Sequence, residues 1–115
     1  MYKKIILNYK GKKIQLELKE MVGPFNEARG LMFSCKKNAK ALLFSFKKPT
    51  GLSMHSFFVF FKFISIWLDE NNKIIEIRKI SPWGIGIKPK TKFTKLIEIP
   101  INGKYKEIIK LLDED

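Results

Sequence analysis

Few residues in this chain have side chains suited to catalysis or metal binding, and they are widely spaced. His55 is the only histidine and Cys35 the only cysteine. Zinc sites need several ligands at paired spacings, so these two residues predict no metal site. Together they would form a nucleophile and its base, but the sequence places no acid or amide to orient the imidazole. We therefore interpret Cys35 as a buried thiol in the core and His55 as a packed or surface histidine rather than a metal ligand. We therefore expect neither a metal ion nor a cofactor.

Arginine is scarce in a chain that otherwise uses lysine. Of 23 basic residues, only Arg29 and Arg78 are arginines. A guanidinium group differs from an ammonium group because it presents a fixed fork of donors that matches a carboxylate. We expect Arg29 to hold a carboxylate in this way, either that of a ligand or that of Asp69 or Glu98.

Length and composition predict one domain that spans residues 1–115. The hydrophobic fraction of 45% is enough for a packed core, and a single cysteine excludes an intramolecular disulfide. The longest apolar run, residues 57–68, is shorter than the ~20 residues of a membrane-spanning helix and contains Lys62. The apolar stretch near the N-terminus is too short for a signal peptide. We therefore expect a soluble, cytoplasmic protein without a membrane span.

The formal net charge of +12 is unevenly distributed. No aspartate or glutamate occurs from Ala28 to Leu68, or from Ile77 to Ile97, where six residues are basic. A basic face of this kind suits an anionic ligand or nucleic acid. The same charge is also expected if the protein simply has a lysine-rich composition and these lysines lie on an ordinary solvated surface. Both interpretations remain open.

The hydrophobic pattern predicts a β-rich fold. Residues 2–8 and 14–18 predict a hairpin that turns at Lys10-Gly11, because glycine accepts a positive φ and the second segment alternates apolar and polar side chains. Residues 57–68 are apolar on both faces and predict a buried central strand, which turns at residues 69–72 into a return strand at residues 73–79.

Two short helices complete the prediction. Residues 24–29 begin with a proline and are followed by Gly30, which suits the end of a helix. An apolar stripe from Tyr105 to Leu112 at helical spacing follows Asn102, a suitable cap. The predicted fold class is mainly β (α+β): a compact curled antiparallel sheet or small barrel with two short helices.

Several segments, in order, resemble the uncharacterised DUF192 family in its archaeal form. They are Ala28-Arg29-Gly30-Leu31-Met32-Phe33, Met54-His55-Ser56-Phe57-Phe58-Val59, Leu68-Asp69, Pro82-Trp83, and Ile97-Glu98-Ile99-Pro100 with Gly103. The family's usual Pro-Ile-Asp after the Phe-Phe-Val strand is replaced by Lys62-Phe63-Ile64. The resemblance implies a small β-rich domain with short helices and implies no particular reaction.

Three functions are compatible with these features. The leading hypothesis is a non-catalytic binding module for an anionic or small ligand, with Arg29, His55, Asp69, Trp83 and Glu98 as ligand-binding residues. The second is an enzyme that uses Arg29, His55 and Asp69. The third is a structural or protein-interaction domain. A shared cleft for Arg29, His55 and Trp83 would favour the first two hypotheses, whereas a buried Trp83 would favour the third.

Overall fold

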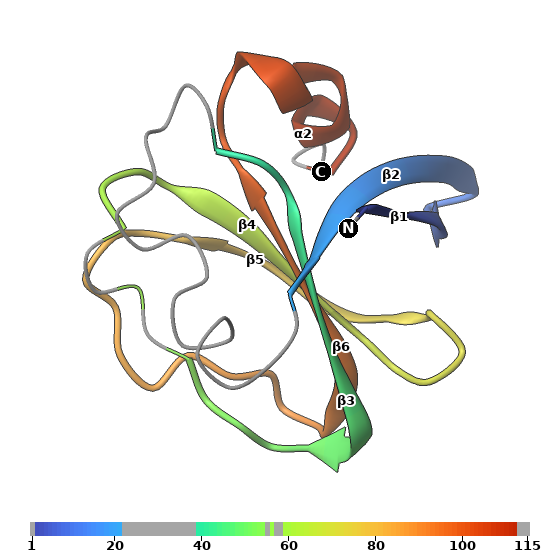
Figure 1. Ribbon diagram of the computed structural model, residues 1–115, viewed down its shortest axis with the longest axis vertical. Helices are drawn as coiled ribbons and strands as arrows, with labels where there is room; N and C mark the ends of the chain where they lie inside the picture. Colours follow the sequence, from blue (N-terminus) through green and yellow to red (C-terminus); the bar gives the residue numbers. More distant parts are fainter. Residues whose placement is uncertain (1, 22–38, 55, 57–58, 113–115) are drawn as a thin grey trace.

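The computed structural model describes residues 2–21, 39–54, 56 and 59–112, which form a strongly curled six-stranded sheet with a short C-terminal helix (Figure 1). Along the sheet the strands follow the order β1-β2-β3-β6-β4-β5. In chain order they are β1 (Tyr2–Tyr9), β2 (Lys12–Met21), β3 (Leu42–Thr50), β4 (Phe63–Leu68), β5 (Ile74–Ile80) and β6 (Phe93–Pro100). The predicted β-rich fold is confirmed.

The sheet is mixed, and the prediction of a purely antiparallel sheet is therefore wrong. β2 and β3 pair in parallel, while the other neighbouring strands pair antiparallel. A tight turn can join only antiparallel strands, whereas parallel strands need a crossover connection of a dozen or more residues. Residues 22–41, between β2 and β3, are numerous enough for such a connection.

Both predicted hairpins are confirmed. β1 and β2 meet at Lys10 and Gly11, which have φ values of 51° and 77°. Two successive left-handed residues are the backbone of a type I′ turn, whose twist matches that of the flanking strands. β4 pairs with β5 on one side and β6 on the other, so it is a central strand. It begins at Phe63, six residues later than predicted; residues 57 and 58 lie outside the described residues.

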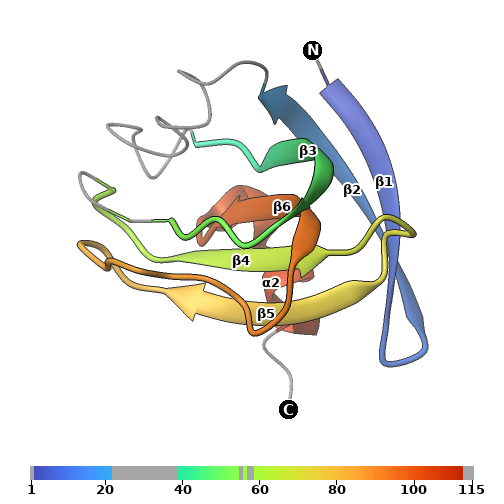
Figure 2. The same ribbon diagram turned by 90° about the horizontal axis from the view of Figure 1, so that it is seen from below.

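The two faces of the sheet bury separate hydrophobic clusters. The first lies inside the curl and includes Ile64, Ile66 and Leu68 of β4. The second lies on the opposite face and includes Phe63 and Trp67. Every residue of β4 is buried, as the apolar pattern on both faces predicts. The curl brings the edge strands β1 and β5 near each other, although they stand at opposite ends of the strand order (Figure 2).

The C-terminal helix closes one end of the curled sheet (Figure 1). A 3-10 turn, η1 (Gly103–Tyr105), leads into α2 (Lys106–Leu112), and the Asn102 side chain accepts a hydrogen bond from the Lys104 N–H at 3.1 Å. The Tyr105 hydroxyl accepts a hydrogen bond from the Ala41 N–H at 2.6 Å and so ties the helix to the sheet. The predicted helix and its cap are confirmed here. The prediction of two short helices is not matched: α2 is the single α-helix of the described residues, and residues 24–30 lie outside them.

Candidate functional site: a basic pocket between two hairpin turns

The described members of the predicted site do not form one cluster. Arg29 and His55 lie outside the described residues. Asp69 and Trp83 lie beyond opposite ends of β5, a seven-residue strand about 20 Å long at the usual rise per residue. Glu98 lies in the middle of β6, opposite Ser65 of β4 and Leu42 of β3. Each of these positions therefore needs its own interpretation.

Asp69 builds the turn between β4 and β5. Its Oδ1 atom accepts hydrogen bonds from the backbone N–H of Asn71 at 2.8 Å and of Lys73 at 2.9 Å. Its own N–H donates to the Lys73 carbonyl at 3.0 Å. Asn72 takes the left-handed conformation, with φ of 62°, as asparagine tolerates better than most residues. The carboxylate of Asp69 thus fixes the conformation of three residues that line a pocket.

This pocket, which we call the hairpin pocket, lies between the β1–β2 turn and the β4–β5 turn. It is open to solvent and has a volume of about 650 Å³. Its lining residues come from the edge strands and their turns: Ile6, Asn8, Tyr9, Lys10, Asn71, Asn72, Lys73 and Ile74. The Lys10 ammonium lies 5.3 Å from the centre of the Tyr9 ring, a cation–π contact. The Lys95 ammonium donates to the Asn72 side-chain oxygen and brings a third positive charge beside the pocket.

The chemistry of the hairpin pocket suits anion binding. Lysine ammonium groups and asparagine amide groups are hydrogen-bond donors, and charge-assisted hydrogen bonds to a carboxylate or phosphate are the stronger kind. The lining contains no carboxylate, histidine or cysteine that could serve as a general base or nucleophile. Sequence reasoning identified both turns and missed the pocket, because the two turns are about 60 residues apart and meet only through the curl of the sheet.

Glu98 has a buried carboxyl group, which lies on the face of the sheet that carries the second hydrophobic cluster. It is 6% exposed, and the residues on either side of it in β6, Ile97 and Ile99, are fully buried. Burial raises the pKa of the Glu98 carboxyl from 4.5 to about 8, because a charge is poorly solvated there. The group is therefore mostly protonated at neutral pH, and it lies outside the hairpin pocket.

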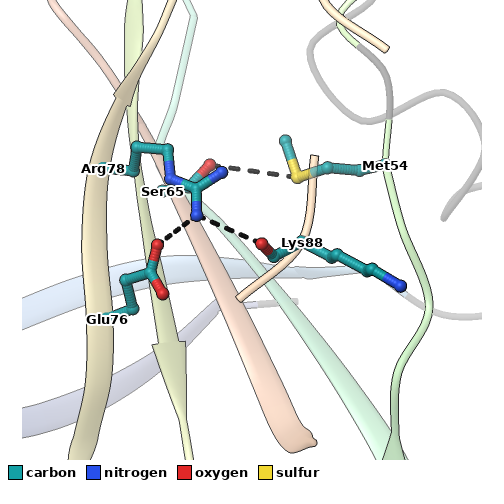
Figure 3. Close-up of polar contacts among 5 residues, drawn as sticks. All are labelled: Met54, Ser65, Glu76, Arg78 and Lys88. Carbon is teal, nitrogen blue, oxygen red and sulfur yellow. Dashed lines mark hydrogen bonds and ion pairs between the residues drawn. The ribbon is translucent and has the colours of Figure 1, made fainter. Parts of the chain in front are cut away.

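Arg78 fastens a loop to the same face of the sheet. Its guanidinium lies between the carboxylate of Glu76 and the carbonyl of Lys88, and it donates to that carbonyl at 3.1 Å (Figure 3). It also lies over the Trp67 ring, 5.4 Å from the ring centre. Beside it, the Ser65 hydroxyl points at the Met54 sulfur, 3.9 Å away (Figure 3). These contacts hold the segments that contain Met54 and Lys88, which are also joined by backbone hydrogen bonds between Met54 and Ile87.

Trp83 is 52% exposed, so it is not the buried residue that a purely structural role would predict. Within the described part of the chain, no group of three histidine, cysteine, aspartate or glutamate side chains is placed to hold a metal ion. No helix among those same residues has the length and apolar character needed to cross a membrane.

The curled mixed sheet with a C-terminal helix defines a class of small β-rich proteins that includes solved structures. One is a protein from Sinorhizobium meliloti described as a candidate transcription regulator, with a TM-score of 0.73, 18% identity, and coverage of 90% of this chain and 81% of that one. Another is a protein of unknown function from Novosphingobium aromaticivorans, with a TM-score of 0.75, 12% identity, and coverage of 93% and 78%. At these identities the similarity establishes the fold alone.

The chain belongs to the DUF192 family, described as an uncharacterised conserved family, whose model matches residues 5–108. It is also 32% identical over 73 residues to the UPF0127 protein of Pyrococcus horikoshii. That match covers 64% of this chain and 63% of the relative, so it spans less than two thirds of the relative's length. The resemblance seen in the sequence motifs is confirmed.

Proposed function

We propose that this protein is a non-catalytic module that binds a small anionic ligand in the hairpin pocket. The observation that supports the proposal is the lining of this pocket: two lysines and three asparagines around about 650 Å³ of open space, held by two tight turns. A ligand with one or two carboxylate or phosphate groups would accept hydrogen bonds from Lys10, Lys73 and the asparagine amides.

Electrostatics and rigidity both support this assignment. The net charge of +12 raises the local concentration of anions around the protein, and the two lysines direct them to the pocket. The turn at residues 69–73 is already ordered by Asp69, so little conformational entropy is lost when a ligand binds. An exposed lysine pair of this kind gives modest affinity, since solvent screens each charge.

The enzyme hypothesis, with Arg29, His55 and Asp69, gains no support from Asp69, because one of its oxygens is occupied by two backbone N–H groups of its own turn. The role of Arg29 stays a proposal with its own test. If Arg29 anchors a ligand, Arg29→Lys should leave the free protein as stable as wild type and abolish stabilisation by that ligand. If Arg29 is structural, the same change should lower thermal stability without ligand.

The direct test is a titration of the isotope-labelled protein with inorganic phosphate, sulfate and citrate. Binding is measured by the changes in the NMR chemical shifts of the backbone amides. Saturable shifts should be confined to residues 6–10 and 71–74. Lys10→Gln and Lys73→Gln should each weaken binding by about 10-fold, as expected for loss of one charge-assisted hydrogen bond. The matched control Lys104→Gln removes an exposed lysine of η1, away from the pocket lining, and should leave binding unchanged. Shifts spread over all exposed lysines would refute the site.

A further inference from the structure

Two large aromatic side chains are exposed side by side on neighbouring loops. Phe60 is 62% exposed and Trp83 is 52% exposed. Their ring centres are 6.1 Å apart and the ring planes are tilted by 70°, an edge-to-face pair. We call this pair the aromatic platform. It shares no residue with the hairpin pocket, so a ligand of that pocket does not account for it.

A buried serine holds the loop that carries Trp83. The Ser56 hydroxyl donates to the Ser81 carbonyl at 2.7 Å and accepts from the Gly84 N–H at 2.6 Å. The Ser56 backbone accepts from the Trp83 N–H and donates to the Gly84 carbonyl, both at 2.9 Å. Ser56 is fully buried, so these four bonds are shielded from competing water.

The backbone at Trp83 is held in an unfavourable conformation. Its φ is 65°, in the left-handed region that bulky residues avoid. A Cβ on the next residue, Gly84, would lie 2.9 Å from Ile87 Cδ1 and 3.1 Å from Ser56 Oγ, so a larger residue there would require the Ile87 or Ser56 side chain to shift. Strain of this kind persists only where surrounding contacts impose it, and it is concentrated at functional sites. Here the imposed conformation keeps the indole ring of Trp83 at the surface, so the strain is not offset by packing of this ring in the core.

The sequence segments that carry the two rings of the aromatic platform are basic and contain no acid. Both aromatic residues lie in the two stretches of sequence that contain no acid, residues 28–68 and 77–97. The exposed basic side chains of the segments next to the rings are Lys62, Lys79, Lys88 and Lys90. The contact between Arg78 and the Lys88 carbonyl fixes the loop that bears two of them (Figure 3). These lysines favour a negatively charged partner at this surface.

We propose that the aromatic platform binds single-stranded nucleic acid, with bases stacked on Trp83 and Phe60 and phosphates neutralised by the neighbouring lysines. Exposed aromatic rings interspersed with basic residues are the elements of sequence-tolerant single-strand binding. Duplex bases are stacked on one another and offer no face to these rings. Every base has a face that can stack on an aromatic ring, so the binding should be largely independent of base sequence. A second copy of this chain would bring the same positive charge to the surface and be repelled.

The test measures fluorescence anisotropy of a labelled 12-nucleotide oligo(dT) and of a duplex of equal length, at low and moderate salt. The single strand should bind more tightly than the duplex. Trp83→Ala should weaken single-strand binding by about 10-fold or more, as expected for loss of one stacked base. Tyr2→Ala removes an exposed aromatic residue of β1 and should change nothing. Lys10→Gln and Lys73→Gln should also leave the affinity for the oligonucleotide unchanged. This result would distinguish binding at the aromatic platform from binding in the hairpin pocket.

Tryptophan fluorescence gives a second reading. The chain has two tryptophans, Trp67 is fully buried, and Trp83 is exposed, so bound bases should quench Trp83 alone. The quenching should vanish in Trp83→Ala. If that variant does not fold, quenching of the wild type together with weaker binding by Phe60→Ala decides the question. The proposal is overturned by absence of binding at low salt, by equal affinity for the duplex, by unchanged affinity of Trp83→Ala, or by a dimer that depends on Trp83 and binds no oligonucleotide.

Discussion

Replacing Glu98 with glutamine should remove a pH dependence that the buried carboxyl imposes on stability. Glutamine has nearly the same shape and stays neutral at every pH. In the folded wild-type protein, burial holds the pKa of Glu98 at about 8, against 4.5 in the unfolded chain. Between these two values the unfolded chain has released a proton that the folded protein keeps. Stability contributed by the protonated carboxyl is therefore complete below pH 4.5 and is lost as the pH rises toward 8.

The size of the effect follows from the interval between the two pKa values. Each pH unit within it lowers the free energy of unfolding by about 1.4 kcal/mol. Relative to Glu98→Gln, the wild type should lose about 3 kcal/mol by pH 7 and at most about 5 kcal/mol above pH 8. This is a large share of the ~5–15 kcal/mol that stabilises a typical domain. The variant should thus be markedly more stable than wild type in alkaline buffer.

Urea unfolding of both proteins from pH 4 to pH 9, followed by the fluorescence of buried Trp67, measures this difference directly. Taking the difference between the two proteins cancels groups that titrate alike in both. Glu17→Gln, at an exposed position of β2, is the matched control and should follow the wild-type pH profile. Parallel profiles for wild type and Glu98→Gln would refute the reasoning, because they would mean that the carboxyl ionises as easily in the folded protein as in the unfolded chain.

Three other predictions concern hydrogen bonds and backbone conformation. Tyr105→Phe should lower the free energy of unfolding by about 1–3 kcal/mol, since it leaves the buried Ala41 N–H without its acceptor; an unchanged urea midpoint would contradict this. Asn72→Ala should cost about 1 kcal/mol at its left-handed φ, whereas Asn72→Gly should stay close to wild type in thermal melts. Ser56→Ala should cost about 1–3 kcal/mol and change the Trp83 fluorescence, because both hydroxyl bonds disappear; Ser53→Ala, at an exposed position, is the control.

Local sequence signals predicted much of the sheet. The Lys10-Gly11 turn, the turn after Asp69 and the Asn102 cap are each specified by side chains within a few residues of the backbone they order. Burial of all six residues of β4 followed from apolar side chains on both faces. The start of that strand was predicted too early, because Val59 and Phe61 are buried in loop segments rather than in a strand, and hydrophobicity does not distinguish the two.

Periodicity and turn chemistry act over short distances, so the amino-acid sequence alone was enough to predict the family, the β-rich class, the hairpins and the C-terminal helix. Three features became visible only in the folded protein: β6 lies between β3 and β4, β2 and β3 run in parallel, and the edge strands approach each other. The hairpin pocket and the aromatic platform both depend on this tertiary arrangement. Each joins segments that are distant in the chain, and only the twist and curl of the whole sheet determine which distant segments meet.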